Sequence, residues 1–222
     1  ISKSLTQEQK KYKIFLCGGD TTFSNILSFS ITSVGYSNNI IYRNNAKNND
    51  DIYVTGNLGD SFTGLQILKN KIKVKKKKIE NYFINKYYLP DIQIDLPKKL
   101  FKFANASIDV SDGLISDLEK MINRQNLSYT LNGSNIPISK YLAKLIKIKK
   151  LDKYYFISNG DDYQTLFTAN PNKARIILNT SKNLGIKITK IGKITSRIKK
   201  SIIIDQKGKQ IKVKNKGYTH QF

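Results

Sequence analysis

The sequence predicts an α/β or α+β fold, because segments with strand-like composition alternate with segments that have helical spacing. The apolar run Ala106–Val110 is typical of a strand, and Phe62–Lys69 places Leu65 and Leu68 on one helical face. No sequence period in the range of solenoid repeats occurs. The 222 residues suffice for one large or two modest domains with hydrophobic cores.

The N-terminal part is expected to contain two strands, Lys13–Leu16 and Ser28–Val34, which flank the glycine-containing turn Gly18–Thr22. The polar, asparagine-rich segment Ser37–Asp51 has the composition of a connection. It is the best candidate for a domain boundary, and a short strand, Asp51–Val54, follows it.

The strand Ala106–Val110 is predicted to run through a tight turn into a helix. The helix begins near Leu114, because apolar residues follow it at the fourth and seventh positions, and Ser111 or Asp112 is expected to be its N-cap. The remaining expected elements are the strands Thr165–Thr168, Lys187–Ile194, Ser201–Ile204 and Gln210–Val213, and a helix from Pro171 to about Leu184.

The formal net charge of +23 suggests nucleic acid as a partner, since lysine and arginine displace counterions from phosphates. Nearly all of this charge is lysine, spread among abundant isoleucine and asparagine, and all three residues have AT-rich codons. The densest cluster, Lys69–Lys78, has seven lysines in ten residues and follows a helical stretch. We interpret it as a solvated helix end or loop, and we do not expect nucleic acid as a partner.

No apolar run has the length of a membrane span or the character of a signal peptide. The single cysteine, Cys17, excludes an intramolecular disulfide and is interpreted as a small buried apolar side chain. A soluble, cytoplasmic protein is therefore expected. The chain opens on Ile1, so we expect that its natural N-terminus is absent or was removed.

Several catalytic classes are excluded by what the sequence lacks. Its one histidine, His220, lies two residues from the end, and one histidine with one cysteine cannot form a structural zinc site. No P-loop sequence is present, and no G-x-G-x-x-G run follows a strand. If the protein handles nucleotides, it does so by another route.

Aspartates beside glycines remain as the candidate chemistry. Carboxylate oxygens suit Mg²⁺, which bridges to substrate phosphates, and phosphoryl transfer needs chiefly alignment and charge neutralisation. Helix starts after Gly59 and Asp112 offer N–H groups to anions. Asp60 could be only a turn or N-cap residue, whereas Asp109 would be costly to bury in its apolar run without a cation or donors. The full set is Asp20, Asp60, Asp109, Asp112, Asp161 and Asp162.

Six blocks match one family in order and spacing. They are GGDTT at Gly18–Thr22, VTGNLGDSFTGL at Val54–Leu65, IDVSDGLISDL at Ile108–Leu118, NGDDYQTLFT at Asn159–Thr168, KIGKI at Lys190–Ile194 and GYTHQF at Gly217–Phe222. In these blocks the chain resembles thiamine-monophosphate kinase, of the aminoimidazole-ribonucleotide synthetase-like superfamily. The resemblance implies α/β (α+β) architecture, with two-layer mixed-sheet domains of that type.

The resemblance further implies a kinase that transfers the γ-phosphoryl group of ATP to thiamine monophosphate, giving thiamine diphosphate and ADP with Mg²⁺ as cofactor. Carried over motif by motif, the Mg²⁺ ligands are Asp20, Asp109 and Asp112; the nucleotide contacts are Gly19, Arg43 and Ser111; and the contacts to the thiamine substrate are Asp161 and Tyr218. Tyr218 would stack on the cationic thiamine rings.

The chain departs from the family pattern at three places. Asp161 replaces the usual glutamate, Asn159 replaces a glycine, and Phe23 stands where a basic residue is common. The family's N-terminal aspartate motifs are not in the sequence. We therefore expect residues 1–46 to be the end of an N-terminal ATP- and Mg²⁺-binding domain, and residues 47–222 to form the C-terminal α/β domain. A homodimer would form through the missing N-terminal domain.

Three alternatives remain open on sequence alone. The first is another ATP-using enzyme of the same superfamily with a different acceptor. The second is a basic nucleic-acid-binding protein, whose binding would be steeply salt-dependent and would weaken when Lys69–Lys78 is neutralised. The third is an inactive fragment.

Overall fold

The structure is a computed structural model that describes residues 2–196 and 200–218. The chain forms two compact units, residues 1–39 and residues 40–222, and each is described by itself. Within the described residues, no helix is both long and apolar enough to cross a membrane.

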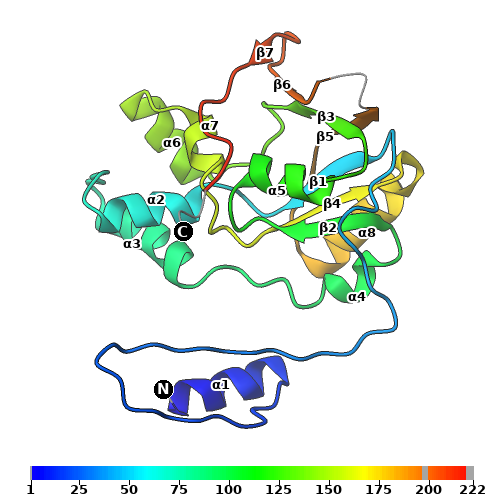
Figure 1. Ribbon diagram of the computed structural model, residues 1–222. Coiled ribbons are helices and arrows are strands. Elements are labelled where there is room, and N and C mark those ends of the chain that lie inside the picture. Colours follow the sequence, from blue (N-terminus) through cyan, green and yellow to red (C-terminus); the bar gives the residue numbers. More distant parts are fainter. Residues whose placement is uncertain (1, 197–199, 219–222) are drawn as a thin grey trace. The chain divides into compact units, whose positions relative to one another are not determined.

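The first unit contains one helix, α1 (Ser2–Tyr12), followed by extended chain without regular secondary structure (Figure 1). The two strands expected at Lys13–Leu16 and Ser28–Val34 are therefore wrong. A strand needs a neighbour to satisfy its backbone N–H and C=O groups, and the described part of this unit offers none. For the same reason no apolar layer covers Cys17, which is exposed and not buried as expected.

The second unit is built on a mixed sheet whose described strands run in the order β2-β4-β1-β5-β3-β6-β7. Neighbouring strands are antiparallel except for β3 and β6, which are parallel. The strands are β1 (Asp51–Thr55), β2 (Ala104–Asp109), β3 (Leu127–Asn132), β4 (Thr165–Ala169), β5 (Ile188–Ser196), β6 (Ile202–Ile204) and β7 (Gln210–Ile211). The strands expected from the sequence in this unit are confirmed, with ends that differ by a few residues.

Helices pack on both faces of this sheet, as Figure 1 shows. Side chains alternate along β1, so Ile52 and Val54 join the core under α5, while Tyr53 lies on the opposite face and stacks on Phe167 at 5.3 Å between ring centroids. The described helices of this unit are α2 (Asp60–Leu68), α3 (Lys77–Tyr88), α4 (Pro97–Leu100), α5 (Leu114–Met121), α6 (Lys140–Lys149), α7 (Lys153–Ile157), η1 (Pro171–Lys173) and α8 (Ala174–Leu184).

A third cluster of buried side chains holds four helices together beside the sheet. Phe62 of α2, Phe83 of α3, Leu142 of α6 and Phe156 of α7 are all buried in it. The lysine-rich segment Lys69–Lys78 connects α2 to α3 and enters the first turn of α3, and all seven of its lysines are exposed. These four helices therefore fix the position of α2, whose N-terminus contacts the loop that contains Asp162.

Candidate active site

Two loops distant in the sequence lie side by side at the end of the edge strand β2. Val110 donates its N–H to the carbonyl of Gln164 at 2.8 Å, and the Asp161 N–H donates to the carbonyl of Ser111 at 2.9 Å. The close approach requires glycine at position 160, where φ is +72° and an added Cβ would lie 2.0 Å from the Ser111 oxygen. The IDVSDG and NGDDY blocks are thus joined through their backbones.

The C-terminal segment docks onto the same pair of loops. Tyr218 donates its N–H to the carbonyl of Asp112 at 2.8 Å, and the Asn215 amide donates to Asn159 Oδ1 at 3.2 Å. Tyr218 is 58% exposed. His220 and the rest of the GYTHQF block lie outside the described residues. Three of the six sequence blocks therefore meet here.

Three of the predicted carboxylates act electrostatically on the phenol of Tyr163. Burial raises the pKa of Tyr163, and the charges of Asp161, Asp109 and Asp112 raise it further. The pKa of Asp161 is itself raised, first by burial and then by the negative charge of Asp112, while Lys69 opposes the shift. Like charges close to one another favour a cation between them.

Asp109 does not have the environment that the sequence suggested. It is the last residue of β2, an edge strand, and its side chain is exposed rather than buried among apolar neighbours. The expectation that rested on the cost of burying this carboxylate is therefore wrong. Its position at the strand end beside Asp112 still leaves its oxygens available as ligands.

The turn between β2 and α5 is held by a carboxylate that sequence reasoning missed. Oδ2 of Asp117, which is 1% exposed, accepts the N–H groups of Asp112 at 2.9 Å and Gly113 at 3.1 Å. The expected N-cap, Ser111 or Asp112, is wrong: Gly113 occupies that position with φ +119°, and no side chain caps from it. Asp117 reaches back from within the first turn of the helix, where a carboxylate also suits the helix dipole.

Lys120, one turn further along α5, bridges two carboxylates of this turn. Its ammonium group forms close ion pairs with Asp112 and, at 3.1 Å, with Asp117 Oδ1. Partial burial lowers the pKa of Lys120, but the hydrogen bonds to Asp112 and Asp117 outweigh this and raise it overall. A positive charge is therefore held on the carboxylate of Asp112.

The second aspartate of NGDDY has a structural task at the start of α2. Asp162 accepts the N–H of Gly59 at 2.7 Å through Oδ2 and that of Ser61 at 3.3 Å through Oδ1. Burial raises the pKa of Asp162 to about 8, against the opposing effect of these two hydrogen bonds. The expectation that the helix start after Gly59 offers these N–H groups to an anion is wrong, because Asp162 already binds them.

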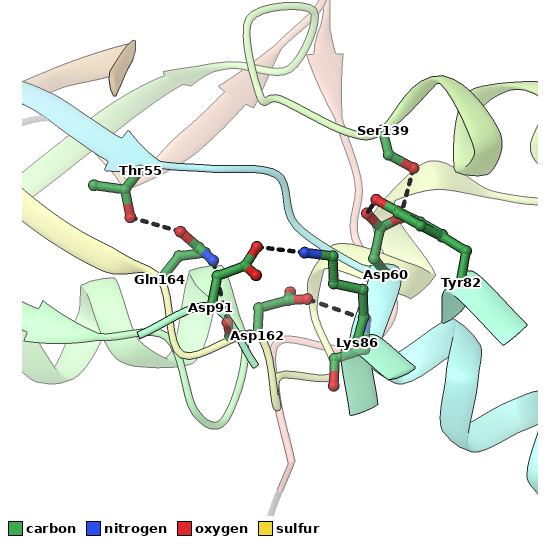
Figure 2. Close-up of polar contacts among 9 residues, drawn as sticks. Thr55, Asp60, Tyr82, Lys86, Asp91, Ser139, Asp162 and Gln164 are labelled. Atoms are coloured by element: carbon green, nitrogen blue, oxygen red, sulfur yellow. Dashed lines mark hydrogen bonds and ion pairs between the residues drawn. The ribbon is translucent and has the colours of Figure 1, made fainter. Parts of the chain in front are cut away.

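Beside this helix start, Asp60 links three helices (Figure 2). It accepts hydrogen bonds from Ser139 Oγ and from the Tyr82 hydroxyl, both at 2.7 Å, and burial raises its pKa. A cavity of about 70 Å³ adjoins these groups, and Lys86 pairs with Asp91 at its wall. Asp60 is thus more than the turn residue that the sequence suggested: it ties α2 to α3 and α6.

Within the second unit, one predicted site residue lies apart from the others. Arg43 is exposed, and the next residue, Asn44, donates its N–H to the carbonyl of Met121 at 2.8 Å, at the C-terminal end of α5. Asp112 precedes the other end of this helix, about 12 Å away by helix length. Gly19 and Asp20 belong to the first unit, where both are exposed and Asp20 Oδ1 accepts the Thr21 N–H at 2.8 Å.

A divalent cation fits the donor chemistry of this turn. Asp109 and Asp112 supply hard carboxylate oxygens of the kind that Mg²⁺ prefers, and the Lys120 ammonium already marks a place for positive charge on Asp112. In the described part of the chain, no group of three or more His, Cys, Asp or Glu side chains is assembled to hold a metal ion. The turn accordingly offers a partial ligand set.

Solved structures share this fold. The chain superposes with a TM-score of 0.66 on thiamine-monophosphate kinase from Stenotrophomonas maltophilia K279a, at 25% identity over 78% of this chain and 55% of that one. It superposes equally well on the structure described as AaThiL complexed with AMPPCP and TMP, at 28% identity over 82% of this chain and 54% of that one. Escherichia coli HypE, at 16% identity and a TM-score of 0.60, shares the fold alone. The second unit therefore has the aminoimidazole-ribonucleotide synthetase-like fold.

Comparison with curated sequences identifies one family among the proteins that share this fold. No protein-family model matches the chain. It is 40% identical over 224 residues to thiamine-monophosphate kinase of Buchnera aphidicola subsp. Schizaphis graminum, covering 99% of this chain and 68% of the relative. It is 33% identical over 223 residues to the Escherichia coli K12 enzyme, covering 99% of this chain and 67% of the relative. The chain belongs to the thiamine-monophosphate kinase family, and it spans about two thirds of the length of these relatives.

Proposed function

We propose that the protein phosphorylates thiamine monophosphate at the expense of ATP. A terminal phosphate oxygen of thiamine monophosphate attacks the γ-phosphorus of ATP, and the bond from that phosphorus to the β,γ-bridging oxygen breaks. The products are thiamine diphosphate and ADP. The observation that carries the proposal is the 40% identity to a thiamine-monophosphate kinase along nearly the whole chain. A family structure with AMPPCP, an ATP analogue, and TMP supports it.

The joined loops supply the residues that we assign to this reaction. Asp109 and Asp112 would hold Mg²⁺, which when bound neutralises the negative charge of the transferring phosphoryl group. Ser111 lies between them in the sequence, and its carbonyl accepts the Asp161 N–H. Asp20, Gly19 and Arg43 remain proposed contacts for metal and nucleotide. Positioning and charge neutralisation suffice for phosphoryl transfer, so no nucleophilic side chain is needed.

The thiamine moiety would be recognised by opposite charge and by an aromatic face. Asp161 supplies a carboxylate at the loop end, and the Tyr218 ring, exposed and tied by its backbone to Asp112, can stack on a cationic ring. Because Tyr218 and Asp161 are both bonded to the IDVSDG turn, substrate and metal would be held by one rigid piece of backbone.

Two larger assignments belong to the same proposal. Residues 1–46 would end an N-terminal ATP- and Mg²⁺-binding domain and residues 47–222 would form the C-terminal domain, with a homodimer formed through the N-terminal domain. Sedimentation of the protein at several concentrations tests the dimer. Consumption of ATP fits a cytoplasmic location.

The direct test is ATP turnover with and without thiamine monophosphate, with thiamine diphosphate identified by mass. Stimulation by thiamine monophosphate and formation of the diphosphate are expected. ATP turnover that ignores thiamine monophosphate would favour a superfamily member with another acceptor. No turnover, together with tight and steeply salt-dependent DNA or RNA binding, would favour the nucleic-acid alternative.

A further inference from the structure

Lys120 places a positive charge on a carboxylate that the proposed function assigns to the metal. We infer that the Lys120 ammonium group is an internal counter-ion that competes with the divalent cation for Asp112, so that metal binding displaces it. This inference rests on the proposed function only in taking Asp112 as a metal ligand.

The geometry supports competition rather than a purely structural role. Lys120 has two carboxylate partners, and these have different environments: the Asp117 side chain is 1% exposed and bound to the turn backbone, whereas the Asp112 side chain is 21% exposed. The Lys120 side chain is itself 41% exposed. It can therefore release Asp112 into solvent or to a metal ion while keeping Asp117 as its partner. No buried charge is left without a partner by this exchange.

The local sequence explains why the lysine reaches this position. Asp117 and Lys120 are separated by three residues on α5, so they lie on the same helical face. Asp117 also holds the N–H groups of Asp112 and Gly113, which brings the Asp112 side chain to the same end of the helix. Asp117 thus positions both the proposed ligand and its competitor.

The expected size of the competition follows from the exposure of the pair. Partly exposed ion pairs stabilise by about 0–1 kcal/mol. Because the metal must displace Lys120 from Asp112, divalent-metal binding should be weaker by a factor of up to about five. Lys120 therefore lowers the metal affinity but does not prevent binding.

The first experiment measures Mn²⁺ binding to the full chain by electron paramagnetic resonance, without ATP or thiamine monophosphate. Lys120→Gln is expected to bind Mn²⁺ about two- to five-fold more tightly than the unmodified protein. The matched control is Lys216→Gln, which removes the same charge from a lysine that pairs with Glu119 at 2.8 Å on the same helix but has no ion pair with Asp112. The Mn²⁺ affinity of Lys216→Gln should differ less than two-fold from that of the unmodified protein. Unchanged or weaker binding in Lys120→Gln would overturn the inference.

A second experiment needs no variant at Lys120. An amine-acylating reagent is applied with and without saturating Mg²⁺, and modification of each lysine is quantified by mass spectrometry. Mg²⁺ should raise the modification rate of Lys120 and leave that of Lys216 unchanged; equal rates for Lys120 with and without Mg²⁺ would contradict displacement. Both experiments omit the substrates, so a failed kinase assay would sink the proposed function without deciding this inference.

Discussion

The carboxyl group of Asp162 caps helix α2 from a position 103 residues later in the chain, accepting the Gly59 N–H at 2.7 Å. Gly59 is the N-cap residue of α2, with φ +84° and no side chain to cap with, so the cap comes from another loop. Because the neighbouring Asp161 is fixed by Ser111, this one loop connects the helix start to the proposed metal turn.

Removing this carboxyl group should destabilise the second unit. Asp162→Ala leaves two buried N–H groups without acceptors, and each costs about 1–3 kcal/mol, so we expect a loss of several kcal/mol in the free energy of unfolding, measured in urea. The matched control is Asp205→Ala, because Asp205 Oδ1 also accepts two backbone N–H groups, from Lys207 at 2.8 Å and Lys209 at 2.9 Å, but at an exposed turn. Water can replace the Asp205 oxygen at this exposed turn, so the loss in the free energy of unfolding should be smaller than for Asp162→Ala. Equal losses for the two variants would contradict the buried cap.

The same carboxyl group should make stability depend on pH. Burial raises the pKa of Asp162 from its ordinary value of 3.8 to about 8, so between these values the folded protein retains a proton that the unfolded chain has lost. Stability should therefore fall as pH rises through this window, by about 1.4 kcal/mol per pH unit from this group, and level off above it. Subtracting the pH profile of Asp162→Asn from that of the unmodified protein isolates the contribution. A difference profile that is flat from pH 4 to 8 would refute it.

Gly160 should be intolerant of any side chain. Its φ of +72° costs alanine about 1–2 kcal/mol, and an added Cβ would also lie 2.0 Å from the Ser111 oxygen. Gly208 is a close control, with φ +77° and no atom within 4 Å of an added Cβ. Gly208→Ala should lose only the stability that the positive φ costs an alanine. Gly160→Ala should lower the melting temperature further, and it should also raise KM for thiamine monophosphate. Similar melting temperatures for the two variants would show that the loops are not closely packed.

Replacing the proposed metal ligand should remove activity while leaving the fold. Asp112→Asn keeps the size of the side chain but loses the charge that would bind Mg²⁺, so we expect turnover to fall by roughly 100-fold or more. Asp95→Asn, an exposed aspartate that pairs with Lys98 at 2.8 Å, serves as the control and should retain normal turnover. Unchanged turnover of Asp112→Asn at ordinary Mg²⁺ concentrations would contradict the ligand assignment.

The sequence was informative where structure is local and apolar. Strands such as β4 and the helix after IDVSDG were predicted because their periodicity reports burial directly. The expected N-terminal strands failed for the opposite reason: an alternating pattern describes a face that can be covered, but it does not supply the neighbouring strand. The sequence of helix α6 also has a helical pattern, with Leu142 and Leu145 buried three residues apart.

The polar contacts of the site were hidden because they depend on distant partners. Ser139 lies 79 residues from Asp60, and nothing in the local sequence indicates that they bond. The local sequence around an aspartate in a simple turn does not differ from that around a buried aspartate that ties three helices together. Asp117 is different, since an acidic residue in the first turn of a helix is a known N-terminal signal, and it could have been found.

The bond from Tyr218 to Asp112 separates what stabilises the fold from what shapes the proposed site. A chain that lacked Asn215–Tyr218 would keep the described strands of the sheet and the residues of the three hydrophobic clusters. It would lose the hydrogen bonds that the Tyr218 N–H and the Asn215 amide make to the IDVSDG and NGDDY loops. An unfolding measurement on such a shortened chain would therefore report little of what the proposed site had lost.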